Sequence, residues 1–228
     1  MKSLTIVTGA SSNHFKSLLN LIRSIRVHCS DVDLIVYDLG LTNTEREQLP
    51  NPRIFLYEEY PAFFNINIEA GQYAWKPAII HEVCSEKPNN PVLWLDAGCL
   101  VTNTLTQFER TLKTEGLYSP TSSGNIHHWT HPTTLRLMRV SKKVKTMPNR
   151  TAGVIGVYST DARKLMKKWC DYSHCRSIIA PKGSNRLNHR QDQAVLSVLI
   201  NQHKTFKNNI TQHLFSCISI HNDVDDPS

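Results

Sequence analysis

The sequence predicts an α/β protein with a mostly parallel central sheet and helices on both of its faces. Short apolar runs typical of buried strands alternate with helical segments about every 25 to 30 residues, which favours parallel strands joined by helices. The chain has 228 residues, 40% of them hydrophobic, and this suits one compact globular domain. We therefore expect a single domain over residues 1–228.

Four apolar runs in the first part of the chain predict strands. They cover residues 4–8, 34–37, 53–57 and 91–96. A helix is predicted after the first run, and its apolar face consists of Phe15, Leu18, Leu19, Ile22 and Ile25. Thr42 and Glu45 form a capping box that predicts the start of a short helix. Residues 73–84 predict another helix, in which Pro77 must lie in the first turn because proline breaks a helix interior.

The second half of the chain is less regular. Residues 121–131 are rich in Ser, Thr, Gly and His, and this composition predicts a loop. Further strands are expected at 152–158 and 214–220, with helices at 161–172 and 188–201. The segment between those two helices, residues 176–186, contains Pro181 and Gly183 and is predicted to be a mobile lid.

The net charge of +7, from 26 Lys and Arg against 19 Asp and Glu, suits a nucleic acid, an anionic membrane or a phosphate-bearing substrate. The basic residues gather at Lys142, Lys143, Lys145 and Arg150 and again at Arg163, Lys164, Lys167 and Lys168. No aromatic platform for single-stranded nucleic acid accompanies them, so we do not expect a nucleic-acid partner. We interpret them as solvated helix faces, with phosphate contact by one or two of them as the alternative.

The sequence lacks the pattern of a membrane anchor or a targeting signal. The first apolar run is broken by Gly9, Ser11 and Ser12, too early for the core of a signal peptide. No stretch approaches the roughly 20 apolar residues of a membrane span. The six cysteines have neither C-x-x-C nor zinc spacing, so we expect reduced thiols. These features predict a cytoplasmic protein without a membrane span, unless a targeting segment has been removed.

The strongest candidate for a functional residue is Asp96, at the exit of a buried strand and before the small residues Ala97 and Gly98. A carboxylate is costly to bury unless it binds a cation or accepts hydrogen bonds. A divalent metal bridging Asp96 to a diphosphate would offset that cost. The alternative is a structural role, in which Asp96 caps the following turn through Thr102 or backbone amides.

Other polar residues are predicted near the carboxyl ends of the strands, where parallel α/β sheets bind ligands. Asp38 ends the second strand, and His221 follows the last strand as either a metal ligand or a surface histidine. Asp192 and Gln193 begin an apolar helix, where the helix dipole alone also favours an acid. A histidine group at His127, His128 and His131 matches no standard zinc site.

Five short motifs occur in order along the chain. They are T-G-A-S-S at 8–12, I-V-Y-D-L-G-L at 35–41, Y-A-W-K-P at 73–77, L-W-L-D-A-G at 93–98 and H-R-Q-D-Q at 189–193. Together they resemble the GT-A superfamily of glycosyltransferases over residues 4–222. The similarity is greatest to a poorly characterised glycosyltransferase-like family and more distant to the family-8 glycosyltransferases. The resemblance implies a single GT-A-type, Rossmann-like domain, with a nucleotide-binding half at about 1–100 and an acceptor or sugar-side half at about 101–228.

The resemblance also implies roles for individual residues. The residues expected to border the nucleotide base and ribose are Thr8, Gly9, Ala10, Ser11 and Asp38. Lys76 would face the donor, and Asp192 and Gln193 would lie near the reacting sugar as the catalytic Asp-Gln element. Asp96 would match the first acid of the Asp-x-Asp metal motif, and His221 the metal-binding histidine near the C-terminus. The second acid is replaced by Gly98, which leaves Mn²⁺ or Mg²⁺ to Asp96, His221, diphosphate oxygens and water.

These features predict a glycosyltransferase that moves a hexose or pentose from a nucleotide-diphosphate sugar to a hydroxyl of a glycan or glycoconjugate, with help from a metal. UDP is expected as the carrier because it is the common one in this superfamily. If Asp192 is a general base the transfer inverts the anomeric centre, and if Asp192 or Gln193 supports a front-face transfer the configuration is retained. The first alternative is a non-catalytic nucleotide-sugar-binding module, which the missing second acid makes credible. The second is a nicotinamide-dependent oxidoreductase, which the turn at 8–12 disfavours because it lacks the three-glycine fingerprint.

Overall fold

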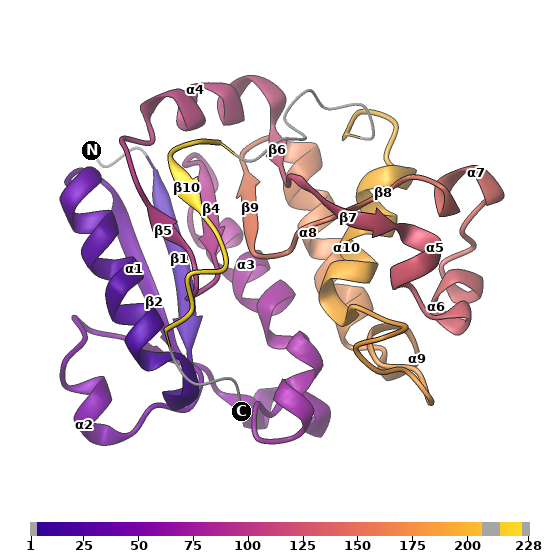
Figure 1. Cartoon of the computed structure of the whole chain (residues 1–228), viewed down its shortest axis with the longest axis horizontal. Coiled ribbons are helices and arrows are strands. Elements are labelled where there is room, and N and C mark those ends of the chain that lie inside the picture. The colour runs from indigo at the N-terminus through magenta and orange to yellow at the C-terminus, as the bar shows by residue number, and fades with distance from the viewer. Residues whose placement is uncertain (1–3, 207–214, 225–228) are drawn as a thin grey trace.

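A computed structural model describes residues 4–206 and 215–224 of the chain, and its core is a six-stranded sheet (Figure 1). The strands are β1 (Thr5–Ala10), β2 (Asp33–Asp38), β3 (Arg53–Ile54), β4 (Val92–Leu95), β6 (Leu117–Tyr118) and β9 (Val154–Val157). Their order is β3-β2-β1-β4-β9-β6. β1 is parallel to β2 and β4, and β2 to β3, whereas β9 is antiparallel to both of its neighbours. The predicted mostly parallel sheet is confirmed.

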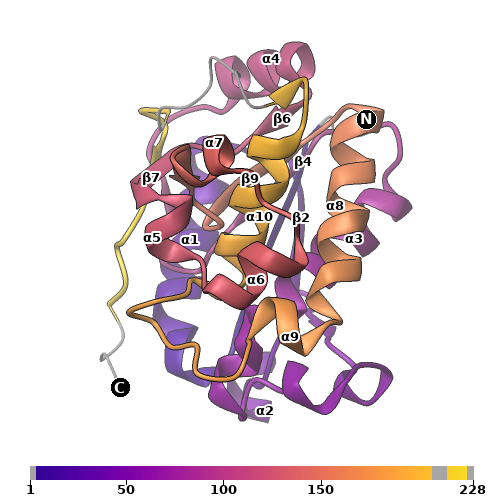
Figure 2. The same ribbon diagram turned by 90° about the vertical axis from the view of Figure 1, so that its right-hand side faces the viewer.

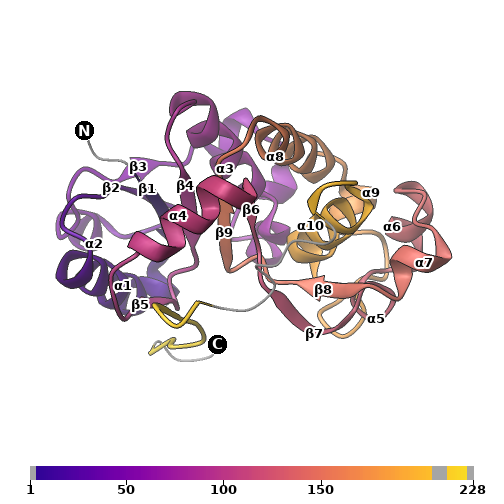
Figure 3. The ribbon, with the colours of Figure 1, turned by 90° about the horizontal axis from the view of Figure 1, so that it is seen from above.

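Helices cover both faces of this sheet, as predicted. They include α1 (Phe15–His28) and α4 (Thr106–Glu115) on one face, and α3 (Trp75–Glu86), α8 (Thr160–Ser173) and α10 (Gln191–Gln202) on the other. Figures 2 and 3 show α1 on one side of the strands and α3 with α8 on the opposite side. Successive side chains of a strand point to opposite faces, so Leu93 packs with the α1 layer while Trp94 packs with the α3 layer.

Short elements complete the fold. The helical ones are η1 (Ser12–His14), α2 (Asn43–Arg46), η2 (Tyr57–Glu59), η3 (Ala62–Phe64), η4 (Glu69–Tyr73), α5 (Ile126–Trp129), α6 (Pro132–Leu137), α7 (Lys142–Lys145) and α9 (Arg176–Ile179). Two small antiparallel sheets pair β5 (Leu100–Val101) with β10 (Ile218–Ser219) and β7 (Thr121–Asn125) with β8 (Pro148–Arg150).

The local signals differ in how well they predicted these elements. The capping box is confirmed, because the Thr42 hydroxyl accepts from the Glu45 N–H and the Glu45 carboxylate accepts from the Thr42 N–H. Pro77 lies in the first turn of α3, as required. The third strand was predicted too long, since β3 ends at Ile54. The last strand was also predicted too long, and position 214 of that prediction lies outside the described residues.

Two predictions in the second half were wrong. Residues 121–131 do not form a loop, because β7 pairs with β8 and the Asn125 side chain accepts from the His128 N–H to cap α5. Arg150 does not lie on a solvated helix face. It is buried at 1% exposure on β8, where Nη1 donates to the Ser119 carbonyl. Over residues 4–206 and 215–224, no helix has the length and apolar character needed to cross a bilayer.

Candidate active site

The carboxyl ends of three parallel strands meet at one edge of the sheet. Ala10 at the end of β1 lies opposite Asp38 at the end of β2, and Val7 of β1 lies opposite Trp94 near the end of β4. The turn after β1, Asp38 and Asp96 therefore share this edge, as the sequence predicts. Sheets of this kind bind their ligands here, because the loops that follow the strands surround a crevice.

A buried lysine joins two carboxylates at this edge. Lys76 Nζ lies 2.9 Å from Asp96 Oδ1 and 3.2 Å from Asp192 Oδ2. The side chains of Lys76 and Asp192 are 5% and 7% exposed, whereas that of Asp96 is 42% exposed. Asp96 is thus the member of the group that a ligand reaches from solvent. We refer to Lys76, Asp96 and Asp192 as the edge cluster.

Each member of the edge cluster is held by a regular element. The alternation along β4 places Trp94 and Asp96 on the same face, and the Trp94 Nε1–H donates to Asp96 Oδ1 at 2.6 Å. Lys76 lies in the first turn of α3 and Asp192 in the first turn of α10, where an acid is favoured by the helix dipole. Both helices pack on the face toward which Asp96 points. The three charges therefore converge.

The electrostatics of the edge cluster keep the lysine charged. Burial would lower the pKa of Lys76, but the carboxylates of Asp192 and Asp96 outweigh burial and raise it. Burial raises the pKa of Asp192, and the Lys76 charge opposes that rise. The Lys76 ammonium also lies 5.8 to 5.9 Å from the ring centres of Tyr73, Trp75 and Trp94, which further favours the cation.

The predicted nucleotide-side residues lie beside the edge cluster at the end of β1. Thr8, Gly9 and Ala10 are buried in the strand, while Ser11 is partly exposed at the start of the turn. A side chain at Gly9 would press against Tyr37 of β2, so glycine permits the close approach of the two strands. Ser11 is therefore the side chain of this set that is most open to a ligand.

Asp38 lies at the predicted edge but is already engaged by the protein. Its Oδ1 accepts from the N–H groups of Gly40 and Leu41, and its Oδ2 accepts from Arg46 Nε at 2.6 Å. The residue is 3% exposed. These bonds fix the turn after β2, so Asp38 has a structural role here whatever it contributes to a ligand.

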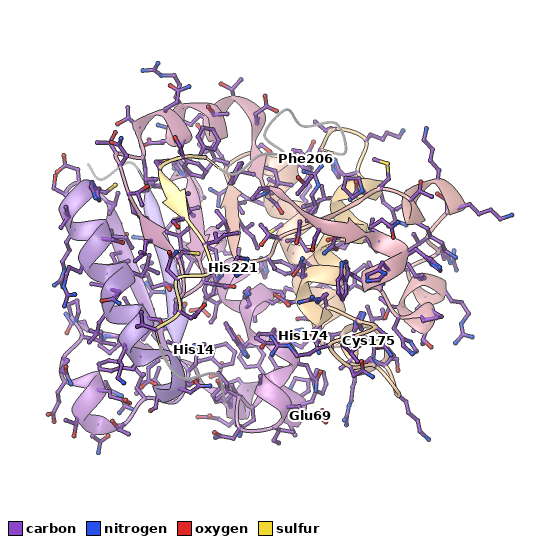
Figure 4. All side chains as sticks on the ribbon, in the orientation of Figure 1. His14, Glu69, His174, Cys175, Phe206 and His221 are labelled. Carbon is purple, nitrogen blue, oxygen red and sulfur yellow. The ribbon has the colours of Figure 1, made fainter. Side chains whose placement is uncertain are left out.

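A cavity of about 770 Å³ opens between η4 and the segment from α9 to α10. Its lining includes Tyr73, whose ring also contacts the edge cluster, and Gln191, which precedes Asp192. Figure 4 labels Glu69 and Cys175, which lie on the two sides where η4 and α9 approach each other. The predicted lid supplies Lys182 and other residues of this wall, so the cavity and the edge cluster belong to one region.

The wall of the cavity formed by η4 has an unusual backbone. Five successive residues have positive φ, and they are Glu69, Ala70, Gly71, Gln72 and Tyr73. A side chain at Gly71 would overlap the Phe64 carbonyl, so glycine is needed there. Left-handed backbone costs other residues about 1–2 kcal/mol each, and such strain is typical of functional sites.

Ala70→Gly is expected to stabilise the protein by about 1 kcal/mol, because glycine adopts φ of 54° without a Cβ clash. Urea unfolding measures the change. The matched control is Ala62→Gly in η3, an exposed alanine with ordinary φ, which is expected to lose about 0.4–1 kcal/mol. Equal destabilisation by both substitutions would show that the left-handed turn is unstrained.

A buried neutral histidine supports the segment before α10. His189 is fully buried, its Nδ1 accepts from the His131 N–H at 3.2 Å, and its Nε2 lies 3.0 Å from the Ile179 carbonyl. Burial lowers the pKa of His189 to about 4. A proton on Nδ1 would also remove the acceptor that the His131 N–H needs. The neutral ring thus ties α9 and the start of α6 to the residues preceding Asp192.

This histidine predicts a loss of stability in acid. The unfolded chain binds a proton near pH 6.5 and the folded chain near pH 4, so the stability contribution is present above pH 6.5 and is lost as pH falls toward 4. We expect about 3 kcal/mol of pH-dependent stability from His189. Urea unfolding from pH 4 to 7 should show a flatter profile for His189→Gln, which keeps a donor and an acceptor. Parallel profiles would contradict this.

The remaining predicted residues are less confined. Gln193 is half-buried in the first turn of α10, next to Asp192. His221 is exposed, with φ of 62°, two residues after the end of β10. The adjacent Asn222 N–H donates to the Gly98 carbonyl at 2.8 Å, so the structure brings the His221 segment to the loop after β4. Among the residues described, no three His, Cys, Asp or Glu side chains are grouped closely enough to hold a metal.

Some residues of this region were not predicted. Tyr73 and Gln72 line the cavity from the left-handed turn, and Asp223 lies against Gly98. The segment E-A-G-Q-Y contains a single glycine, so its sequence does not predict five successive residues with positive φ. The one signal for Asp223 is that it lies two residues after His221, the expected metal-binding histidine. The local sequence does not predict its contact with Gly98.

The sheet and its covering helices have the fold of the GT-A glycosyltransferases. The galactosyltransferase LgtC, solved in complex with donor and acceptor sugar analogues, is similar with a TM-score of 0.56 and 17% identity, over 95% of this chain and 86% of LgtC. The bifunctional glycosyltransferase WbbM in its apo form has a TM-score of 0.52 at 14% identity, over 86% of this chain and 37% of WbbM. The glycosyltransferase GlyE of Streptococcus pneumoniae TIGR4 has a TM-score of 0.52 at 13% identity, over 91% of this chain and 44% of GlyE.

Sequence comparison adds less. Residues 1–81 match a protein family of unknown function, DUF1647. No curated protein matches the chain. The glycosyltransferase-like fold of the chain rests on the similar solved structures.

Proposed function

We propose that this protein is a glycosyltransferase that moves a sugar from a nucleotide-diphosphate sugar to a hydroxyl of a glycan or glycoconjugate. The observation that carries the proposal is the edge cluster, in which a buried Lys76 lies between Asp96 and Asp192 beside an open cavity. Buried charges are costly, and their concentration at the ligand-binding edge of an α/β sheet is typical of an active site. UDP is the proposed carrier.

The proposed donor site must neutralise the diphosphate that leaves as the sugar is transferred. Lys76 supplies one fixed positive charge next to Asp96. Lys182 and Arg186 line the cavity and form no ion pair with the described residues, so they are able to bind phosphate oxygens when the segment closes. These cations give the leaving group a more favourable environment than water does.

A divalent cation fits the exposed side of this site. Asp96 offers carboxylate oxygens, the ligands that Mg²⁺ and Mn²⁺ prefer, and its side chain is 42% exposed although it also pairs with Lys76. Mg²⁺ commonly uses one or two carboxylates together with substrate phosphates, so a cage of three protein ligands is not required. When bound, the ion would neutralise diphosphate charge as a Lewis acid. Asp96 and His221 are the proposed ligands.

Asp192 lies on the proposed sugar side, and two roles for it are distinguished by the product. If Asp192 deprotonates the acceptor hydroxyl, the anomeric centre is inverted. If its charge, with Gln193, stabilises positive charge at the anomeric carbon during a front-face transfer, configuration is retained. The anomeric coupling constant of the transferred sugar measures the outcome directly.

A thermal-shift panel tests the proposed donor site. It combines UDP, GDP, CMP and common nucleotide sugars, each with and without Mn²⁺, on the wild type, Asp96→Ala and the exposed control Asp171→Asn on α8. Binding to the folded state raises its stability, by about 2.7 kcal/mol at a ligand concentration of 100 Kd. We expect one nucleotide to give a metal-dependent shift that Asp96→Ala loses and Asp171→Asn keeps. No shift with any nucleotide would overturn the donor site, and a shift without transfer or donor hydrolysis would favour a non-catalytic binding module.

A further inference from the structure

The loop after β4 carries glycine where the Asp-x-Asp pattern has its second acid, and a carboxylate from elsewhere in the chain fills that space. The C-terminal segment runs from β10 past this loop toward the start of α1, and Figure 4 labels His221 and His14 along its course. The Asn222 N–H donates to the Gly98 carbonyl, and the Val224 N–H donates to Ser17 Oγ at 3.1 Å. Asp223 is held between these two anchors.

The position of Asp223 is defined by the missing side chain of Gly98. The three atoms nearest to the point where a Cβ of residue 98 would lie are the carboxylate atoms of Asp223, with Cγ 2.5 Å from that point. The Cγ of an aspartate at position 98 would itself lie about 1.5 Å from its Cβ. The Asp223 carboxylate therefore occupies the space that a side chain of residue 98 would fill.

The Asp223 carboxylate is also available to a cation. Its side chain is 45% exposed, and it pairs with His14, whose Nδ1 lies 3.6 Å from Asp223 Oδ1 and which is charged only when protonated. Asp96 precedes Gly98 by two residues in the loop after β4, and the Asp223 carboxylate lies against Gly98, so both carboxylates belong to this loop. Two carboxylates with diphosphate oxygens and water form a ligand set that suits Mg²⁺ and Mn²⁺.

We propose that Asp223 supplies the second carboxylate of the divalent-cation site, in place of the acid that Gly98 lacks. This inference rests on the proposed donor site and names a ligand that the linear Asp-x-Asp motif does not contain. It also explains the glycine, because any side chain at position 98 would displace the Asp223 carboxylate. The φ of Gly98 is not positive, so the backbone itself accepts other residues at this position.

The test is a titration with Mn²⁺ alone, in which free Mn²⁺ is measured by electron paramagnetic resonance. Asp223→Asn is expected to weaken Mn²⁺ binding more than about tenfold, as Asp96→Asn does, while Asp171→Asn has no effect. Gly98→Ala is expected to weaken binding although it removes no carboxylate, because the methyl group displaces Asp223. The double variant Gly98→Asp with Asp223→Gly is expected to regain affinity, because it returns the carboxylate to the loop after β4.

Circular dichroism and thermal melting establish that each variant is folded before it is titrated. Wild-type affinity in Asp223→Asn, no Mn²⁺ binding by the wild type, or no recovery in the folded double variant would each overturn the inference. The result is separate from that of the nucleotide panel. A thermal shift with a nucleotide that does not depend on Mn²⁺ would support the donor site and exclude Asp223 as a metal ligand. Mn²⁺ binding through Asp96 and Asp223 without a thermal shift from any nucleotide would support Asp223 as a metal ligand and exclude the donor site.

Discussion

Asp192→Asn is expected to lower the rate of sugar transfer about 10²- to 10⁴-fold while nucleotide-sugar binding changes little. Asparagine has nearly the same shape, so the packing of the first turn of α10 is retained. It lacks the carboxylate that either deprotonates the acceptor hydroxyl or stabilises positive charge at the anomeric carbon. Because the nucleotide is proposed to bind beside Asp96 and Ser11, on the other side of Lys76, its affinity does not depend directly on Asp192.

The measurement is the pair of kcat and KM for the donor that the thermal-shift panel selects. Asp161→Asn is the matched control, because Asp161 is also an acid in the first turn of a helix but is exposed and pairs with Lys164. This control is expected to keep wild-type kcat. Loss of donor binding with an unchanged kcat in Asp192→Asn would contradict a role on the sugar side.

The parts of the site that were predictable from sequence are those held by regular elements. Asp96 follows a buried apolar strand, and the period of two along that strand fixes the face toward which its side chain points. The position of Lys76 was predictable because Pro77 must lie in the first turn of a helix, which places Lys76 in that turn as well. Strand order then brings the ends of β1, β2 and β4 together, which the alternation of strands and helices predicts in general terms.

The parts that sequence did not predict depend on contacts between distant segments. Arg46 reaches back to Asp38 from the following helix, so an acid predicted for the nucleotide side is engaged by the protein itself. The left-handed turn is imposed where Gly71 packs against Phe64, and its other residues carry no turn signal. Arg150 belongs to a group of charges in the sequence, and grouping along the chain does not reveal burial on β8. The pairing of Asp223 with Gly98 is likewise tertiary.

Lys76→Met is expected to destabilise the protein by about 3–5 kcal/mol in urea unfolding at pH 7 with EDTA present. Methionine fills a similar volume among Tyr73, Trp75 and Trp94, so the loss is not that of a cavity. The cost comes from Asp192, whose side chain is 7% exposed and would then either carry an unpaired charge or take up a proton. Removing one partner of a buried ion pair leaves an uncompensated charge, and that is more costly than removing both.

The double variant Lys76→Met with Asp192→Leu separates the ion pair from the packing. Both buried charges are then absent, and Asp96 at 42% exposure can be solvated, so we expect the double variant to regain most of the stability that Lys76→Met loses. Transfer activity should stay absent in both variants, because the charges that the reaction needs are missing. A double variant as unstable as the single one would show that Lys76 stabilises the fold through its packing. Recovery of stability without activity would instead show that the edge cluster is retained for its chemistry, at a cost to the stability of the fold.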